Sequence, residues 1–148
     1  MILVEEQTGE AIQEALNAAF VKQEVTGPVQ LLPRIYEVFE PIVLPHGANL
    51  IGAYPGVPTN HSQGTILLAR NDMEAMVMTD LEQAREGFHV SRILVDGGRE
   101  WDPEKKEYVG PMVQHGLRLL GRKIRLDSVD VSRITGTGVE FEAGGPET

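Results

Sequence analysis

Four histidines, at positions 46, 61, 89 and 115, are the residues of this sequence best suited to metal binding or acid–base chemistry. None of them forms an HxH, HxxxH or HExxH pair, the spacings that place two metal ligands on one element. His46 and His61 lie in predicted loops, and with Asn60 and Asp72 they could form a polar site of a small hydrolase or ligand-binding enzyme. We favour the alternative, in which each loop histidine makes only local hydrogen bonds, and we expect no metal and no cofactor.

Other common catalytic patterns are also missing from the sequence. Ser62 lies in "TNHSQG", which is not the G-x-S-x-G turn of a serine hydrolase. The turn "VDGGRE" lacks the glycine spacing of nucleotide-binding loops. The chain has no cysteine, which excludes disulfides, thiolate metal sites and a cysteine nucleophile. The sequence therefore favours a protein that is not an enzyme, while the loop histidines keep the enzyme alternative open.

The charge distribution is uneven. A net charge of −9 argues against general affinity for nucleic acid. Residues 1–50 hold seven acids against two bases, whereas Arg118, Arg122, Lys123 and Arg125 form a basic stretch. This stretch is either a solvated face or a contact surface that meets the acidic N-terminal third of a neighbouring copy. Trp101 lies in a predicted hairpin, where it could be either a core anchor or an exposed interface residue. We include it in the predicted interface on the second of these interpretations.

These residues must be positioned by one domain of ordinary size. We expect a single α+β domain over residues 1–143 and a flexible polar tail over 144–148. No apolar run approaches the roughly 20 residues of a membrane span, and the N-terminus lacks the pattern of a secretory signal. We therefore expect synthesis in the cytoplasm, with incorporation into a larger particle left open.

Local patterns predict a mainly antiparallel sheet with about three helices. Thr8 could cap an amphipathic helix that ends before Gly27 and Pro28, and residues 29–54 read as strands interrupted by prolines. Residues 65–79 read as a hairpin around Asn71-Asp72, followed by a short helix from Thr79 to Gly87; one helix over 72–86 is the alternative. A second hairpin with its tip at 102–105, a helix over 111–121 and a final hairpin over 123–143 complete the prediction.

One segment has a local resemblance to a known family. "IVLPHGANLIGAY", residues 42–54, resembles a strand–turn–strand in the core subunits of type IV secretion channels. The resemblance implies only that local conformation and carries no function with it. No internal repeat is visible in the sequence.

Together these observations predict a non-enzymatic structural or assembly subunit. Its partners would be copies of itself and other subunits, in a ring or a larger complex such as a virion neck or tail or a secretion channel. The polar loop Gly56–Thr65 would contact a ligand or a neighbouring subunit. The alternative function is the small hydrolase or ligand-binding enzyme that uses His46 and His61.

Overall fold

The computed structural model describes residues 1–21, 24–25, 27–53, 64–80 and 87–143. Two sheets make up most of it, and every strand pair within them is parallel. The first sheet contains β1 (Ile2–Val4), β4 (Val29–Leu31), β5 (Ile35–Val38), β7 (Asn49–Ile51), β8 (Thr65–Ala69), β10 (His89–Asp96) and β14 (Arg125–Ser132). The second contains β6 (Ile42–Leu44), β9 (Met73–Thr79), β13 (Val113–Gly121) and β15 (Thr137–Ala143).

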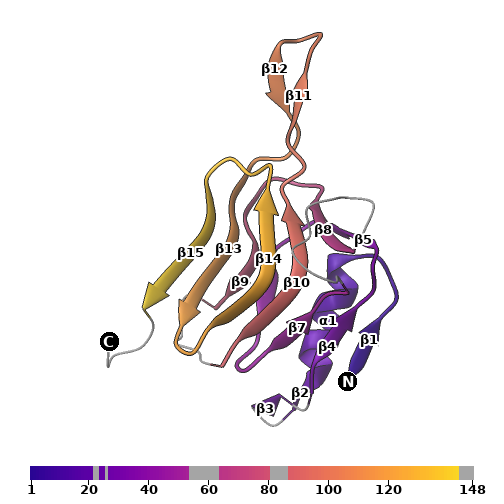
Figure 1. Ribbon diagram of the computed structural model, residues 1–148, viewed down its shortest axis with the longest axis vertical. Helices are drawn as coiled ribbons and strands as arrows, with labels where there is room; N and C mark the ends of the chain where they lie inside the picture. Colours follow the sequence, from indigo (N-terminus) through magenta and orange to yellow (C-terminus); the bar gives the residue numbers. More distant parts are fainter. Residues whose placement is uncertain (22–23, 26, 54–63, 81–86, 144–148) are drawn as a thin grey trace.

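The chain passes repeatedly from the first sheet to the second, and each passage stacks on the one before it (Figure 1). The four coils run from β4 through β5 to β6, from β7 through β8 to β9, from β10 to β13, and from β14 to β15. Parallel coils stacked in this way define a β-solenoid.

The first sheet is curved like half of a barrel, because its longer strands bend. β10 bends at Arg92 and β14 at Ser128, with φ angles of 59° and 55° in the left-handed region. The strand register places these two residues side by side. β10 pairs with β7 before the bend and with β8 after it.

The core consists of stacks of apolar side chains that follow the register from coil to coil. One stack contains Val29, Leu50, Val90 and Leu126. A second contains Tyr36, Leu67, Val95 and Val131. A third contains Ile42, Val77, Leu117 and Val139. In each stack the members from the first three coils are at most 1% exposed. The stacks therefore supply a continuous hydrophobic core along the solenoid.

Helix α1 (Gly9–Ala19) lies at the N-terminal end of this core. The Thr8 hydroxyl accepts a hydrogen bond of 3.1 Å from the Ala11 N–H and so caps the helix. Ile12 and Leu16, four residues apart, are buried against the first coil. This N-terminal amphipathic helix is present as predicted, although it ends at Ala19 and is followed by the short antiparallel pair β2 (Phe20–Val21) and β3 (Glu24–Val25).

The predicted α+β class with a mainly antiparallel sheet is wrong, because the two sheets are parallel and α1 is the only helix among the described residues. The helix predicted over 111–121 is instead strand β13, which pairs with β9 on one side and β15 on the other. Long-range pairing on both edges overrides the local helical pattern there. The predicted helix after Thr79 falls mainly on residues outside the described part, and Thr79 itself ends β9.

Two of the three predicted hairpins are also wrong. β8 and β9 are strands as expected, but they lie in different sheets and do not pair with each other, and the same holds for β14 and β15. The hairpin near residue 102 is confirmed: β11 (Glu100–Asp102) and β12 (Glu107–Val109) form an antiparallel pair with a turn at 103–106. It projects from the end of β10, beyond the body of the solenoid (Figure 1).

The predicted tail, residues 144–148, lies outside the described residues. Within the described part, no helix has the length and apolar character needed to cross a membrane.

Candidate interaction surface

The first coil of the solenoid is covered on each of its strands by the N-terminal segment. β1 pairs with β4. The Glu37 N–H on β5 donates to the Gln7 carbonyl at 3.0 Å. On β6, the Gln13 side chain of α1 accepts from the Val43 N–H at 2.7 Å and donates to the Val43 carbonyl at 2.8 Å. The N-terminal segment therefore supplies hydrogen-bond partners to all three strands of the first coil and acts as a cap on it.

The last coil has no such cap in the part of the chain that the structure describes. β14 pairs only with β10, and β15 pairs only with β13. In Figure 1, β15 lies at the left edge of the body and β14 lies to the left of β10, whereas α1 lies to the right of both strands. We call this surface the open end. It consists of the outer edges of β14 and β15 together with the side chains of Leu126, Val129, Val131, Val139 and Phe141.

Side-chain burial changes abruptly at the open end. Leu119 on β13 is fully buried, whereas Phe141, its partner on β15, is 57% exposed. Leu126, Val131 and Val139 continue the three core stacks but are only half-buried. The coil that would cover these side chains is absent from the described residues, so the hydrophobic core is exposed at this end.

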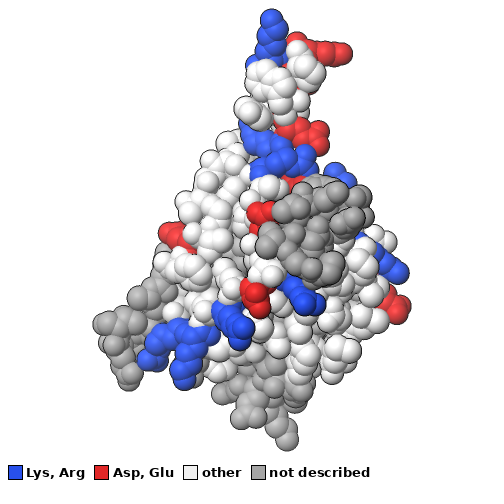
Figure 2. Space-filling model, viewed as in Figure 1, with Lys and Arg blue, Asp and Glu red and all other residues white. Residues whose placement is uncertain are grey.

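Charges along β14 are separated by sign. The turn before the strand holds the exposed Arg122 and Lys123, and the strand begins with Arg125. Figure 2 shows basic side chains gathered near the lower ends of β13 and β14, where this turn lies. Asp127 and Asp130 follow on the strand. The Asp127 Oδ2 lies 3.8 Å from the Arg125 Nη2. The Asp130 Oδ1 accepts a hydrogen bond of 2.9 Å from the Val131 N–H. The strand edge is thus basic at its start and acidic further on.

The β11–β12 hairpin presents a pair of exposed aromatic rings. Trp101 and Tyr108 are cross-strand neighbours, and their ring centroids lie 5.2 Å apart in an edge-to-face arrangement. They are 52% and 62% exposed. Sequence reasoning left open whether Trp101 is a core or a surface residue, and the structure places it on the surface of the hairpin.

An ion pair between the buried Asp96 and the partly exposed Arg133 lies at the base of this hairpin. Asp96 is fully buried and accepts two hydrogen bonds from Arg133, of 2.8 and 2.6 Å. Asp96 also accepts from the Gly98 N–H at 2.8 Å, and Arg133 donates to Glu100 at 2.9 Å. The hydrogen bonds to Asp96 raise the pKa of Arg133, so its guanidinium stays protonated. Arg133 thereby joins the last coil to the first residues of the hairpin.

The predicted interface residues occupy three separate places. Trp101 lies on the hairpin, beyond the end of β10, whereas Arg122, Lys123 and Arg125 lie at the other end of the strands. Arg118 lies on β13, where its guanidinium forms ion pairs with Glu74 of β9 and Glu140 of β15. Of the predicted set, the three residues at 122–125 adjoin the open end.

The predicted loop site is not assembled by the described residues. His46 follows β6, and Asp72 precedes β9. β6 pairs with the last residues of β9, so roughly 20 Å of strand separates the two side chains. Asp72 accepts a hydrogen bond of 2.8 Å from the Met112 N–H. Asn60 and His61 lie outside the described part, as does most of the loop predicted to contact a ligand. No cluster of three or more potential metal ligands occurs among the described residues.

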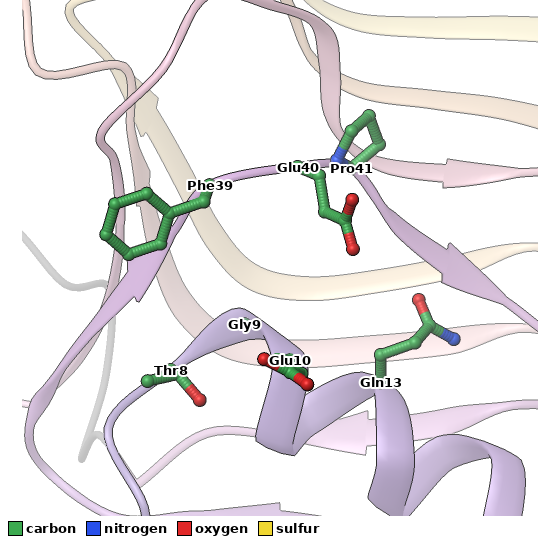
Figure 3. A pocket seen from close by; sticks show the side chains of 7 residues that line it. All are labelled: Thr8, Gly9, Glu10, Gln13, Phe39, Glu40 and Pro41. Atoms are coloured by element: carbon green, nitrogen blue, oxygen red, sulfur yellow. The ribbon is translucent and has the colours of Figure 1, made fainter.

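A pocket of about 310 Å³ lies between the start of α1 and the link from β5 to β6. Figure 3 shows Glu10 and Gln13 on the helix facing Glu40 across it. The carboxylates of Glu10 and Glu40 make this pocket acidic, and Gln13 is already bonded to β6. The pocket thus belongs to the N-terminal cap.

Comparison of the chain with models of protein families, with curated proteins and with solved structures finds no match. The described geometry defines a β-solenoid with one covered and one open end, and the function is argued from that geometry. Sequence reasoning missed the apolar residues of the open end. Their signal was the alternation of apolar residues in "VDV" and "VEF", which we assigned to a closed hairpin.

Proposed function

We propose that the chain is a non-enzymatic subunit that associates with copies of itself, and that the open end forms the contact. The observation that supports this proposal is the contrast between the two ends of the solenoid. An unpaired strand edge is a template for pairing with another chain, and terminal coils normally carry a polar cover. The N-terminal coil has that cover, whereas the described part of the C-terminal coil has an exposed Phe141.

The energetic reason is the apolar surface that association would remove from water. Burial yields about 25 cal/mol for each Å² of apolar surface, and an aromatic side chain supplies much of that surface. Pairing of strand edges adds backbone hydrogen bonds and fixes the relative register of the two chains. Apolar burial would thus supply affinity, and the strand edges would supply orientation.

Light scattering over a range of protein concentrations tests the proposal. We expect the native mass to rise above that of one chain as concentration increases. Phe141→Lys should shift this transition to higher concentration, because it places a charge at the contact. Phe39→Lys is the matched control, since Phe39 is 52% exposed and lies on the link between β5 and β6, away from the open end. A monomer at every concentration would refute the proposal, as would equal effects of the two variants.

The hairpin is a second surface, which we propose for contact with other subunits. Trp and Tyr are enriched at the centres of protein interfaces, and the ion pair at its base holds this pair in place. Because the hairpin lies away from the Phe141 edge, Trp101→Ala should leave self-association unchanged. A loss of self-association in that variant would show that the hairpin belongs to the contact between copies.

Neither the virion nor the secretion-channel assignment finds support in the structure, and neither is proposed further. Likewise no observation favours the hydrolase that would use His46 and His61, because the described residues do not bring a set of catalytic groups together there.

A further inference from the structure

We infer that two copies join open end to open end, with β14 of one copy antiparallel to β14 of the other across a two-fold axis. This inference rests on the proposed function and specifies the geometry of the contact. The inference rests on two observations. When β14 is aligned with a second β14 running in the opposite direction, apolar residues lie opposite apolar residues and basic residues lie opposite acidic ones. The burial of each residue in the fold agrees with this alignment.

An axis between Asp127 and Ser128 matches the apolar residues of β14. In this register Leu126 lies opposite Val129 of the second copy. Both side chains are half-buried and pack against the core, and Leu126 is the last member of one of its stacks. Ile124 lies opposite Val131 in the same way, and both also pack against the core. The two hydrophobic cores would therefore become continuous across the contact.

The same register matches the charged residues. Arg125 lies opposite Asp130 of the second copy, and the two-fold axis produces this pair twice. Arg125 is exposed and Asp130 is half-buried, so the pair would lie at the rim of the contact. In a parallel arrangement of the same strands, like charges would face each other. The order of charges along β14 therefore favours an antiparallel pair of identical strands.

The bend in β14 is also compatible with this axis. Ser128, with φ of 55°, lies next to the axis, so the bends of the two strands fall within one residue of each other. We infer that the same axis also brings the β15 edges of the two copies toward each other, so that Phe141, which is 57% exposed in one copy, loses exposure on dimerisation.

A head-to-tail contact would satisfy less of the surface. At the N-terminal end, the Gln13 side chain already forms hydrogen bonds with the backbone of Val43 on β6. The edge strand next to β4 is β1, which has only three residues to offer for pairing. β15 would then face the helix α1 rather than a strand edge. The acidic N-terminal third is therefore a poorer partner for the open end than a second open end.

Cysteine cross-linking tests the geometry, because the natural chain contains no cysteine. In the inferred dimer, strand spacing and rise place the two Ser128 Cα atoms about 6 Å apart, within the range of a disulfide. Under mild oxidation, Ser128→Cys should form a covalent dimer. Ala18→Cys, at an exposed position of α1, is the matched control and should remain monomeric on a denaturing gel.

The outcomes separate this inference from the proposed function. A native mass of two chains together with a cross-link through Ser128→Cys supports both. A native oligomer without that cross-link overturns the two-fold geometry and leaves self-association standing. A cross-link formed only when the Ser128→Cys and Ala18→Cys proteins are mixed shows a head-to-tail contact and also overturns the inference. A monomer at all concentrations overturns both.

A charge exchange tests the register itself. Arg125→Glu should weaken dimerisation roughly fivefold at low salt, since exposed ion pairs are weak. Adding Asp130→Arg to that variant should restore dimerisation, because the opposite pair is rebuilt with its signs exchanged. Absence of rescue, in a double variant whose circular dichroism matches the natural protein, would refute this register.

Discussion

Leu50 and Leu126 belong to one core stack, and replacing each by Ala should have very different effects. Leu50 is fully buried in the second coil, with Val29 and Val90 on either side of it in the stack, each 1% exposed. Truncation there leaves a cavity that its neighbours cannot fill. We expect Leu50→Ala to lower the free energy of unfolding by about 3 kcal/mol at any protein concentration.

Leu126 is half-buried in the last coil, and the described residues place no further coil beyond it. In dilute protein, Leu126→Ala removes less buried surface and leaves no closed cavity, so we expect a loss of about 1 kcal/mol. At a concentration where copies associate, the same variant should lose more, because the side chain is then covered by the second copy.

Urea unfolding at low and at high protein concentration measures both effects. For a chain of this size, each kcal/mol corresponds to about 2–4 °C in the melting temperature, so thermal unfolding gives an independent check. If Leu126→Ala cost as much as Leu50→Ala in dilute protein, Leu126 would be enclosed within the single chain. The reasoning about the open end would then be wrong.

Three further predictions concern the body of the solenoid. Tyr36→Phe removes the donor of a buried 2.6 Å hydrogen bond to a backbone carbonyl and should cost about 1–3 kcal/mol. Burial raises the pKa of the Tyr36 hydroxyl, so its contribution to the free energy of unfolding should be complete below a pH of about 10 and should fall as the pH rises further. The urea midpoint of Tyr36→Phe should not show this loss at alkaline pH. Arg133→Ala leaves the carboxylate of Asp96 buried without its cation and should cost about 3–5 kcal/mol; an unchanged melting temperature would contradict this. Gly52→Ala should prevent normal folding, because its Cβ would lie 2.0 Å from the Arg92 carbonyl oxygen, and a soluble variant with native circular dichroism would refute that close approach.

The sequence located most strands but not their partners. Residues 65–69 and 73–79 are strands as predicted, and a two-residue turn between strands normally indicates a hairpin. Here that turn marks a corner at which the chain leaves one sheet for the other. Local turn chemistry specifies a change of direction, and it does not specify which strand lies alongside.

The repeat was hidden by insertions of unequal length. Leu50, Val90 and Leu126 occupy equivalent places in successive coils, yet their spacing along the chain differs. The third coil contains the β11–β12 hairpin, which the fourth coil lacks. A fixed period is what reveals a solenoid in a single sequence, and no fixed period exists here.

Residues 113–121 show why periodicity alone failed. Val113, Leu117 and Leu120 fit a helical spacing, whereas Val113, Leu117 and Leu119 fit the alternation of a strand. The structure buries the second set completely. Gly116 was a neglected signal, since a Cβ there would lie 2.4 Å from a methyl group of Val131. A glycine at a close approach of the opposite sheet is typical of a strand in a packed pair of sheets.

Of the candidate site, the sequence supplied the basic residues next to the open end and the aromatic residue of the hairpin. It did not supply Phe141 or Leu126, whose exposure depends on their position in the last coil. That position is a property of the stacking order, which no local pattern encodes.

Amide hydrogen exchange at two protein concentrations tests the central claim most directly, because it reports the strand edges themselves. We predict that amides of β14 and β15 become more protected as concentration rises, while amides of β6, which Gln13 already covers, do not change. Exchange in β14 and β15 that is independent of concentration would contradict the claim that the open end is a contact between copies.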